Sequence, residues 1–308
     1  CALLYSEMVT ADAVIHGERE RLIGYSDVEH PLALQLGGNE PAKLAEASKI
    51  AEDFGYDEVN LNCGCPSDRV QSGAFGACLM REPQLVADCL AAMQDAVKIP
   101  VTVKHRIGVD EDEPRERLFG FVETVSKNSP CTVFHVHARK AWLKGLSPKE
   151  NREIPPLDYD LVHELKTAYP DLLITLNGGL ETVEQSLPHL DHLDGVMLGR
   201  AAYHDPTILL QVDSAIYGAP TRHDDMLDAL KAYRAYIVSE LAKNTPMHAI
   251  TRHILGAFNG RPGARLWRRH LSENAPRREA DIQVFDEALA IVEEQMARAE
   301  AAQEARSA

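Results

Sequence analysis

Cys65 is the residue whose type and position in this chain could most directly do chemistry. It lies in a tight turn flanked by glycine and proline, residues 62–66 (NCGCP), which follows a strand-like segment at 58–62. Strand-end loops are where α/β barrels hold their reacting groups, and a thiol with an ordinary pKa of roughly 8.5 can carry or donate a proton. Two other interpretations stay open, because free cysteines are often buried as small hydrophobic side chains and also bind metals.

Other polar side chains occupy equivalent positions along the chain. Each stands at or just beyond the carboxyl end of a different predicted strand, where a purely structural barrel would hold more valine and leucine. Polar groups that converge on this face are the expected form of an active site. The six residues are Gln35, Asn62, Lys104, His137, Asn177 and Arg200.

The two last predicted strands also end in glycines. Asn177 is followed by Gly178 and Gly179, and Gly199 precedes Arg200. Glycines let backbone N–H groups approach a phosphate closely, and the usual phosphate site of a barrel follows its seventh and eighth strands. The two glycine segments together therefore predict a site for a phosphate-bearing cofactor.

Lys104 has two chemical interpretations. A lysine at a barrel mouth could form a Schiff base, as in barrel aldolases. It could instead hold positive charge beside the edge of a reduced flavin ring, where an anion develops. A phosphate-bearing cofactor fits the second interpretation, although the lysine taken alone does not decide between the two.

Strand-like and helix-like segments alternate through the first two thirds of the chain. This alternation predicts a parallel sheet covered by helices, in a (β/α)8 TIM barrel. Seven strands are counted, so the first β-α unit of an eight-stranded barrel is expected to be missing; an open α/β sheet complete with seven strands is the alternative. The predicted strands are 4–8, 32–36, 58–62, 101–105, 132–137, 172–177 and 195–198.

Strand signals stop after Gly218, where the character of the sequence changes. We therefore expect a catalytic TIM-barrel domain at 1–220 and a helical domain at 221–308. Amphipathic patterns in the second domain are typical of a small four-helix bundle. Its predicted helices are 224–243, 247–258, 263–271 and 281–299.

The helical domain holds a basic stretch that the overall charge conceals. Residues 247–280 carry seven arginines and two acidic residues, whereas the whole chain has a formal net charge of −15. Arginines interleaved with Trp267 and with His253 or His270 suit phosphate backbones and stacked bases. The alternative is a solvated helix face that pairs with the acidic segment 281–294.

Composition narrows the remaining possibilities. The six cysteines form no C-x-x-C pair and no framework of the secreted type, which indicates a reducing, cytoplasmic setting. No apolar run of about 18 residues and no signal-peptide pattern is present, so no membrane association is expected. The long connection 140–159 predicts a lid or binding loop, or a structural Ω-loop.

The sequence resembles the bacterial tRNA-dihydrouridine synthases, most closely their A-type, over essentially its whole length. The stretch 145–159 (GLSPKENREIPPLDY) is especially specific, since no generic barrel requires it. The other matching segments are 33–38 (ALQLGG), 63–71 (CGCPSDRVQ), 76–80 (GACLM), 103–108 (VKHRIG), 137–143 (HARKAWL), 177–179 (NGG), 199–200 (GR), 262–265 (PGAR) and 267–269 (WRR).

This resemblance implies an FMN enzyme that reduces uridine to 5,6-dihydrouridine at positions 20 and 20a of the tRNA D loop, with NADPH as reductant. It implies hydride transfer from flavin N5 to uracil C6 and protonation of C5 by Cys65. Gln35, Lys104 and His137 are expected at the flavin, and Asn177, Gly178, Gly179, Gly199 and Arg200 at its phosphate. Asn62, Arg139, Lys140, Arg261, Arg265, Arg268 and Arg269 are expected to contact uracil, cofactor phosphate or the tRNA body.

The chain departs from the family pattern at two places. A first strand with a Pro-Met pair against the flavin is absent, and Cys63 stands where the family commonly has an apolar residue. We interpret Cys63 as a small hydrophobic side chain rather than half of a metal or redox pair with Cys65, and no metal or obligate protein partner is expected.

Two other functions compete with the one that the resemblance implies. An FMN barrel that reduces a free pyrimidine or an enoate would use Lys104 and the glycine segments, but it would have no use for the arginines between 261 and 278. A tRNA-binding protein that has lost catalysis would purify without colour and still bind tRNA. Activity on free uracil, or tRNA binding without a flavin, would separate these alternatives from the first.

Overall fold

The computed structural model describes residues 2–67 and 73–307, and contacts divide the chain into two compact units. Unit 1 comprises Cys1–Leu180 and Glu184–Met197, and unit 2 comprises Glu181–Val183 and Leu198–Ala308. Contacts thus divide the chain earlier than the predicted boundary at 220/221. The reason is that the residues just after 198 bond and pack within unit 2: Asn259 donates to the backbone carbonyl of His204, and Leu210 packs against the core of that unit.

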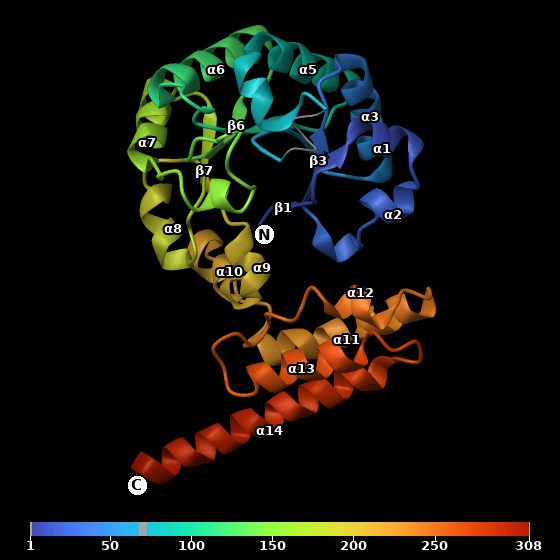
Figure 1. Ribbon diagram of the computed structural model, residues 1–308. Coiled ribbons are helices and arrows are strands. Elements are labelled where there is room, and N and C mark those ends of the chain that lie inside the picture. Colours follow the sequence, from blue (N-terminus) through green and yellow to red (C-terminus); the bar gives the residue numbers. More distant parts are fainter. Residues whose placement is uncertain (1, 68–72, 308) are drawn as a thin grey trace. The chain divides into compact units, whose positions relative to one another are not determined.

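Unit 1 is built on one parallel sheet, in the order β1-β3-β4-β5-β6-β7-β8, with β2 also paired to β3. Figure 1 shows this sheet curving inside a ring of helices, which confirms the predicted barrel-type fold class. Within the described residues, no ladder joins β1 to β8. The strands are β1 (Leu4–Tyr5), β2 (Val9–Thr10), β3 (Leu32–Gly37), β4 (Glu58–Cys63), β5 (Val101–Arg106), β6 (Val133–His137), β7 (Leu173–Asn177) and β8 (Gly195–Met197).

The predicted first strand, 4–8, is two short strands rather than one. Both β1 and β2 pair with β3, and the chain breaks the regular ladder at Ser6. The Ser6 hydroxyl accepts a hydrogen bond of 3.0 Å from the backbone N–H of Gln35. A side chain thus replaces a backbone partner at this point, and the pattern of apolar residues could not show that.

Helices cover the outer face of the sheet, and several begin at a proline. Proline is favoured at the first helical position because its missing N–H has no partner there in any case. Pro41, Pro83 and Pro114 start three of these helices in this way. The helices of this part of the chain are α1 (Ala11–His16), α2 (Arg19–Ile23), α3 (Pro41–Phe54), α5 (Pro83–Ala96), α6 (Pro114–Asn128), α7 (Tyr159–Ala168) and α8 (Val183–Leu190), with short 3-10 turns η1 (Asp27–Glu29), η2 (Gly76–Arg81) and η3 (Glu150–Arg152).

The two faces of the sheet differ in polarity, because successive side chains of a strand alternate between them. The helix-facing side is mainly apolar: Val101 and Val103 are buried there, and the ring of His105 packs 4.8 Å from that of Phe121 in α6. The inner side is polar. Thr102 donates to Glu58 at 2.6 Å, and Tyr5 donates to the same carboxylate at 2.6 Å. Burial and this carboxylate both raise the pKa of Tyr5.

Unit 2 is helical throughout, as predicted for most of its length. Its core is apolar and includes Trp267, whose ring lies edge-on to Phe258 at 5.1 Å and to Phe285 at 5.9 Å. Its elements are α9 (Arg200–His204), η4 (Pro206–Ile208), α10 (Leu209–Tyr217), α11 (Met226–Ala242), α12 (Met247–Thr251), α13 (Ala264–Asn274) and α14 (Ile282–Ser307). Among the described residues, no helix has both the length and the apolar character needed to span a membrane.

Candidate active site

Cys65 lies just beyond the end of β4, in a turn that is held by backbone and side-chain hydrogen bonds. The side-chain oxygen of Asn62 accepts from the backbone N–H groups of both Gly64 and Cys65, each at 3.0 Å. The Cys65 carbonyl accepts from Ala77 at 2.9 Å, and its Sγ lies 3.5 Å from the Ser67 hydroxyl. The turn that carries the thiol is therefore fixed in place, and Cys65 as a residue is partly exposed. Residues 68–71 of this motif lie outside the described residues.

Gln35 and Asn62 continue the same hydrogen-bond network. Asn62 donates to Gln35 Oε1 at 2.6 Å, and Gln35 Nε2 donates to Asn60 at 2.9 Å. Asn60 in turn donates to Thr102 at 2.8 Å. Asn62 is thus a support of the cysteine turn, and its predicted contact with uracil stays a prediction.

Arg106 connects the cysteine turn to the long loop that follows β6. Its Nε donates to the Gly64 carbonyl at 2.9 Å, and its Nη1 donates to the carbonyls of Lys140 and Asn151 at 2.9 and 3.0 Å. The side chain is buried, and burial lowers the pKa of this guanidinium to about 10, while the neighbouring Cys65 opposes that shift. A single buried cation therefore ties the cysteine turn to two points of the long loop.

The Lys104 side chain lies on the inner side of the sheet. No anionic partner for it is found among the described residues. Its Nζ donates to Asn177 Oδ1 at 2.9 Å, and Asn177 Nδ2 donates to the Met197 carbonyl at 2.7 Å. Burial lowers the pKa of Lys104 to about 8; Arg106 also lowers it, whereas Cys65 raises it. The Lys104 ammonium is thus desolvated, and its hydrogen bond goes to a neutral amide oxygen. Binding of an anion next to it would therefore be favourable.

Gly178 and Gly179 form a backbone cradle beside His137 and the long loop. Their φ angles are +113° and +72°, in the region that favours glycine. A Cβ on Gly178 would lie 2.6 Å from His137 Cδ2, and one on Gly179 would lie 2.4 Å from Leu157 Cδ1. Tyr159 fixes the cradle by donating to the Gly178 carbonyl at 2.7 Å. The predicted residues His137, Asn177, Gly178 and Gly179 are thus brought together with Lys104.

Arg139 and Lys140, predicted to meet phosphate, use their charged ends within unit 1. Arg139 Nη1 donates to the carbonyls of Glu153 and Pro155 in the long loop. Lys140 Nζ donates to the carbonyls of Asp110 and Asp112 at 2.9 and 3.2 Å. Both side chains support loops in this structure, and their contacts with phosphate stay a prediction.

The long loop 140–159 is closely tied to itself and to the sheet. Asn151, fully buried at its centre, accepts from the backbone N–H of Trp142 at 2.7 Å and donates to three loop carbonyls. Together with Arg106, these bonds make the segment an ordered Ω-loop. The supporting roles of Arg106 and Asn151 were not predicted from the sequence. Their only signal was that they lie in the motifs 103–108 and 145–159.

Cys63 faces away from the inner side of the sheet. It is fully buried, and burial raises its pKa, as do the nearby Cys89 and Cys131. The structure therefore confirms its interpretation as a small hydrophobic side chain. No group of three or more His, Cys, Asp or Glu side chains that could hold a metal is found in the part of the chain that the structure describes.

The remaining predicted residues belong to unit 2. Gly199 caps the start of α9 and Arg200 is its first residue, and both are exposed. Their predicted partnership with Gly178 and Gly179 stays a prediction. Trp267, by contrast, is buried in the core and donates to the Ile254 carbonyl at 3.0 Å, so its predicted stacking on RNA bases is wrong. The predicted tRNA-binding arginines of unit 2 are Arg261, Arg265 and Arg269, which are exposed, and Arg268, which is partly exposed.

The residues of the mouth of unit 1, by which we mean Gln35, Asn62, Cys65, Lys104, His137 and Asn177, suit a flavin with a phosphate tail. Lys104 supplies a cation, and Gln35 and Asn177 supply amide groups. Gly178 and Gly179 must be glycines, because a Cβ on either would clash with His137 or Leu157. Unit 1 is thus a barrel-type enzyme domain with a partly exposed cysteine and a lysine among the polar residues at its strand ends.

Comparison with known proteins assigns the family. The family model described as Dihydrouridine synthase (Dus) matches residues 1–295, and the chain belongs to this family of flavin oxidoreductases. It is 56% identical over 291 residues to the tRNA-dihydrouridine(20/20a) synthase of Yersinia pestis, covering 94% of this chain and 84% of that protein. The proteins of the same name from Escherichia coli K12 and Xanthomonas campestris pv. campestris are also 56% identical, over 94% and 96% of this chain and 84% and 88% of theirs.

Among solved structures, morphinone reductase is similar with a TM-score of 0.49 and 12% sequence identity. The match covers 72% of this chain and 79% of that one. A likeness of this size carries no argument about function, and the fold class rests on the strand order of unit 1.

Proposed function

We propose that this chain uses FMN and NADPH to reduce uridine to 5,6-dihydrouridine at positions 20 and 20a of the tRNA D loop. The observation that carries this proposal is the cysteine turn, which Asn62 and the Arg106–Gly64 bond hold in place, with Lys104 paired to Asn62 on the neighbouring strand. Family membership and the printed names of the relatives support the substrate. The cytoplasm is the proposed location, and no obligate protein partner is required.

The residues of the mouth divide the work. When bound, the reduced flavin supplies a hydride to C6 of the uracil. Cys65 gives its thiol proton to C5, so that the C5=C6 double bond takes up one hydride and one proton, and the resulting thiolate regains a proton from solvent. Arg106 keeps the cysteine turn in place for this transfer by donating to the Gly64 carbonyl.

Lys104 and the glycine cradle are proposed to hold the cofactor. Lys104 would supply positive charge to an anionic ring edge, and Gln35 and His137 would contact the ring. Asn177, Gly178 and Gly179, with Gly199 and Arg200, would hold the phosphate. NADPH needs only transient access to restore the reduced flavin.

The arginine-rich stretch of unit 2, residues 252–269, is proposed to hold the tRNA body. A uridine inside a folded tRNA must be turned out of its stack to reach the thiol, and a second surface is needed to hold the remaining RNA. Arg261, Arg265 and Arg269 are exposed and suit backbone phosphates.

The experiment incubates the flavin-loaded full chain with NADPH and an unmodified tRNA transcript, and then maps dihydrouridine by position. Dihydrouridine at 20 and 20a is expected, together with no reduction of free uracil. Reduction of free uracil at a comparable rate would favour a small-molecule reductase. A flavin-free protein that binds tRNA and makes no dihydrouridine would favour an inactive tRNA-binding protein.

A further inference from the structure

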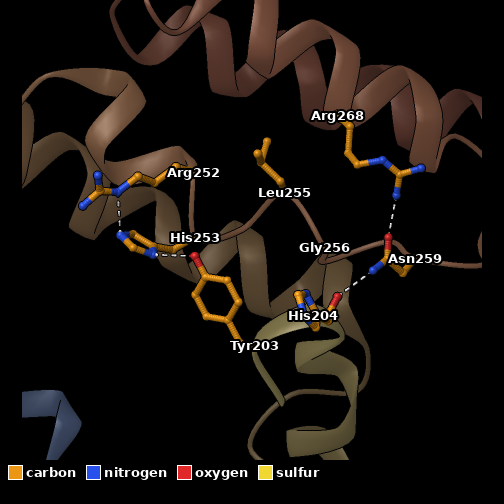
Figure 2. Close-up of a pocket in the computed structure, with 8 residues that line it drawn as sticks. All are labelled: Tyr203, His204, Arg252, His253, Leu255, Gly256, Asn259 and Arg268. Atoms are coloured by element: carbon orange, nitrogen blue, oxygen red, sulfur yellow. Dashed lines mark hydrogen bonds between the residues drawn. The ribbon is translucent and has the colours of Figure 1, made fainter. Parts of the chain in front are cut away.

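Unit 2 contains a pocket of about 270 Å³ between α9 and the segment that runs from α12 into α13, shown in Figure 2. At roughly 30 Å³ per water, it has room for about nine waters. That is enough for part of one nucleotide but not for a base pair. The lining residues include four basic side chains and no carboxylate: Tyr203, His204, Arg252, His253, Leu255, Gly256, Asn259 and Arg268.

One wall of the pocket is a chain of hydrogen bonds that ends at Tyr203. Arg252 Nε lies 3.0 Å from His253 Nε2, and His253 Nδ1 lies 3.1 Å from the Tyr203 hydroxyl (Figure 2). Arginine can only donate, so His253 Nε2 accepts and its ring proton sits on Nδ1. His253 therefore donates to the Tyr203 oxygen, and the Tyr203 hydroxyl keeps its own proton for a ligand.

The opposite wall is a second chain of hydrogen bonds. Arg268 Nη1 donates to the side-chain oxygen of Asn259, and Asn259 Nδ2 donates to the His204 carbonyl at 2.6 Å (Figure 2). This uses one of the five N–H groups of the Arg268 guanidinium. Gly256 completes the wall, since a Cβ there would lie 2.2 Å from the same carbonyl.

The two arginines of the pocket differ from other cations of unit 2. Arg234 pairs with Asp286 at 2.7 Å and Lys231 pairs with Glu293 at 2.7 Å, so those charges are compensated. Within residues 2–67 and 73–307, neither Arg252 nor Arg268 has a carboxylate partner. The pocket thus presents two uncompensated guanidinium groups together with the ring of Tyr203, which is 56% exposed.

We propose that this pocket is a subsite for one unstacked nucleotide of the tRNA, separate from the uridine that is reduced. Arg252 and Arg268 receive its backbone phosphate, the Tyr203 hydroxyl donates to it, and its base lies against the Tyr203 ring. The identity of the RNA as tRNA rests on the proposed function, whereas the pocket and its chemistry do not.

Equilibrium binding of an unmodified tRNA transcript tests the proposal. The protein is the flavin-loaded full chain without NADPH, so that no turnover takes place. Arg252→Gln and Arg268→Gln should each weaken binding by about tenfold and reduce the slope of log affinity against log salt by about one. Arg222→Gln is the matched control, because Arg222 is exposed on the same unit and does not line the pocket. Arg268→Lys, which keeps the charge, should restore most of the salt slope.

Tyr203 separates base stacking from simple phosphate attraction. Tyr203→Leu should weaken binding on the order of tenfold, and Tyr203→Phe by much less, because only the first removes the stacking ring. Unfolding midpoints equal to that of the unchanged protein show that each variant folds. Pocket variants that match Arg222→Gln in affinity and salt slope would overturn the subsite.

The two proposals fail in distinguishable ways. If the unchanged protein makes no dihydrouridine but the pocket variants still lose tRNA affinity, the proposed function fails and the subsite stands. If dihydrouridine forms normally and the pocket variants keep both tRNA affinity and KM, the subsite fails alone. Variants that raise KM for tRNA while leaving kcat unchanged at saturating tRNA support both proposals.

Discussion

The mouth of unit 1 and the arginine-rich stretch of unit 2 are built in opposite ways. In the mouth and the cysteine turn, polar side chains are bound to one another: Asn62 makes three hydrogen bonds, and the buried Arg106, which supports this turn, also makes three. In the stretch 252–269, several arginines are exposed, and Arg252 and Arg268 have no carboxylate partner among the described residues. Reaction requires groups that are already oriented, whereas RNA binding uses charges that remain available.

This difference predicts which property, turnover or tRNA affinity, a substitution in each region should change. A change in the mouth should reduce kcat and often also stability, because it leaves buried polar groups without partners. A change in the stretch 252–269 should reduce tRNA affinity in a salt-dependent way and leave stability nearly unchanged. The following predictions test this division, beginning with the largest expected effect.

Cys65→Ala should lower the rate of dihydrouridine formation by about 10²- to 10⁴-fold, the usual contribution of a positioned proton donor. Flavin should remain bound, because the thiol is not part of the predicted cofactor grip. Single-turnover kinetics with pre-reduced protein measure this step directly. Cys78→Ala is the control, since Cys78 is also a partly exposed cysteine of unit 1. Equal rates for the two variants would contradict the proposed role of Cys65 as proton donor.

Arg106→Lys should lower kcat by roughly 100-fold and leave KM for tRNA little changed. Lysine keeps the charge but cannot span the carbonyls of Gly64, Lys140 and Asn151 at once, so the cysteine turn loses its support. Arg117→Lys is the control, because Arg117 pairs with Asp112 at 2.9 Å at a more exposed position. A variant that loses stability while kcat is maintained would show that Arg106 is only structural.

Lys104 should make flavin binding depend on pH. Because burial lowers its pKa to about 8, Lys104 loses its charge as the pH of the flavin-free protein rises through 8. An anionic ligand favours the charged form, so flavin affinity should fall above pH 8, by up to about tenfold per pH unit. Fluorescence titrations from pH 7 to 9.5 measure this, and Lys104→Met should flatten the profile. An equally steep profile in Lys104→Met would assign the effect to another group.

The same lowered pKa predicts how the stability of the flavin-free protein depends on pH. The folded state binds fewer protons at Lys104 than the unfolded state between about pH 8 and 10.5. The contribution of Lys104 to stability therefore rises as the pH increases through this range. Urea unfolding of the unchanged protein and of Lys104→Met at pH 7.5 and 9.5 should show this gain only with the lysine present.

Arg261→Gln, Arg265→Gln and Arg269→Gln should have the smallest effects, a few-fold each on tRNA affinity. These side chains are exposed, and each is expected to contact one phosphate at most. Affinity measured at several salt concentrations should show reduced slopes with unchanged kcat. A large loss of kcat in any of them would break the division between the two regions.

Much of unit 1 could be predicted from the sequence, because its information is local. Alternating strands and helices predicted the parallel sheet, and polar residues at strand ends predicted Lys104 and Asn177, which the structure joins by a hydrogen bond. The break at Ser6 could not be predicted, since a side-chain hydroxyl replaces a backbone partner there. Nor could the role of Arg106, whose three acceptors are carbonyls from distant segments.

Unit 2 was harder to predict in detail. Its helices follow from amphipathic patterns, but the second predicted helix, 247–258, ends at Thr251. The chain then turns around Gly256, which packs against the His204 carbonyl. Composition suggested Trp267 as the aromatic residue for RNA, yet it lies in the core, and the exposed ring near the arginines is Tyr203. Tertiary packing decides which aromatic residue faces solvent, and composition cannot.

Position-resolved mapping of dihydrouridine tests the central proposal most directly. Flavin-loaded protein, NADPH and an unmodified tRNA transcript are incubated in deuterated water, and the product is analysed by mass spectrometry. The proposal predicts dihydrouridine at positions 20 and 20a, with solvent deuterium at C5. It predicts almost no dihydrouridine with Cys65→Ala. Uridines that stay unreduced, or full reduction by Cys65→Ala, would contradict it.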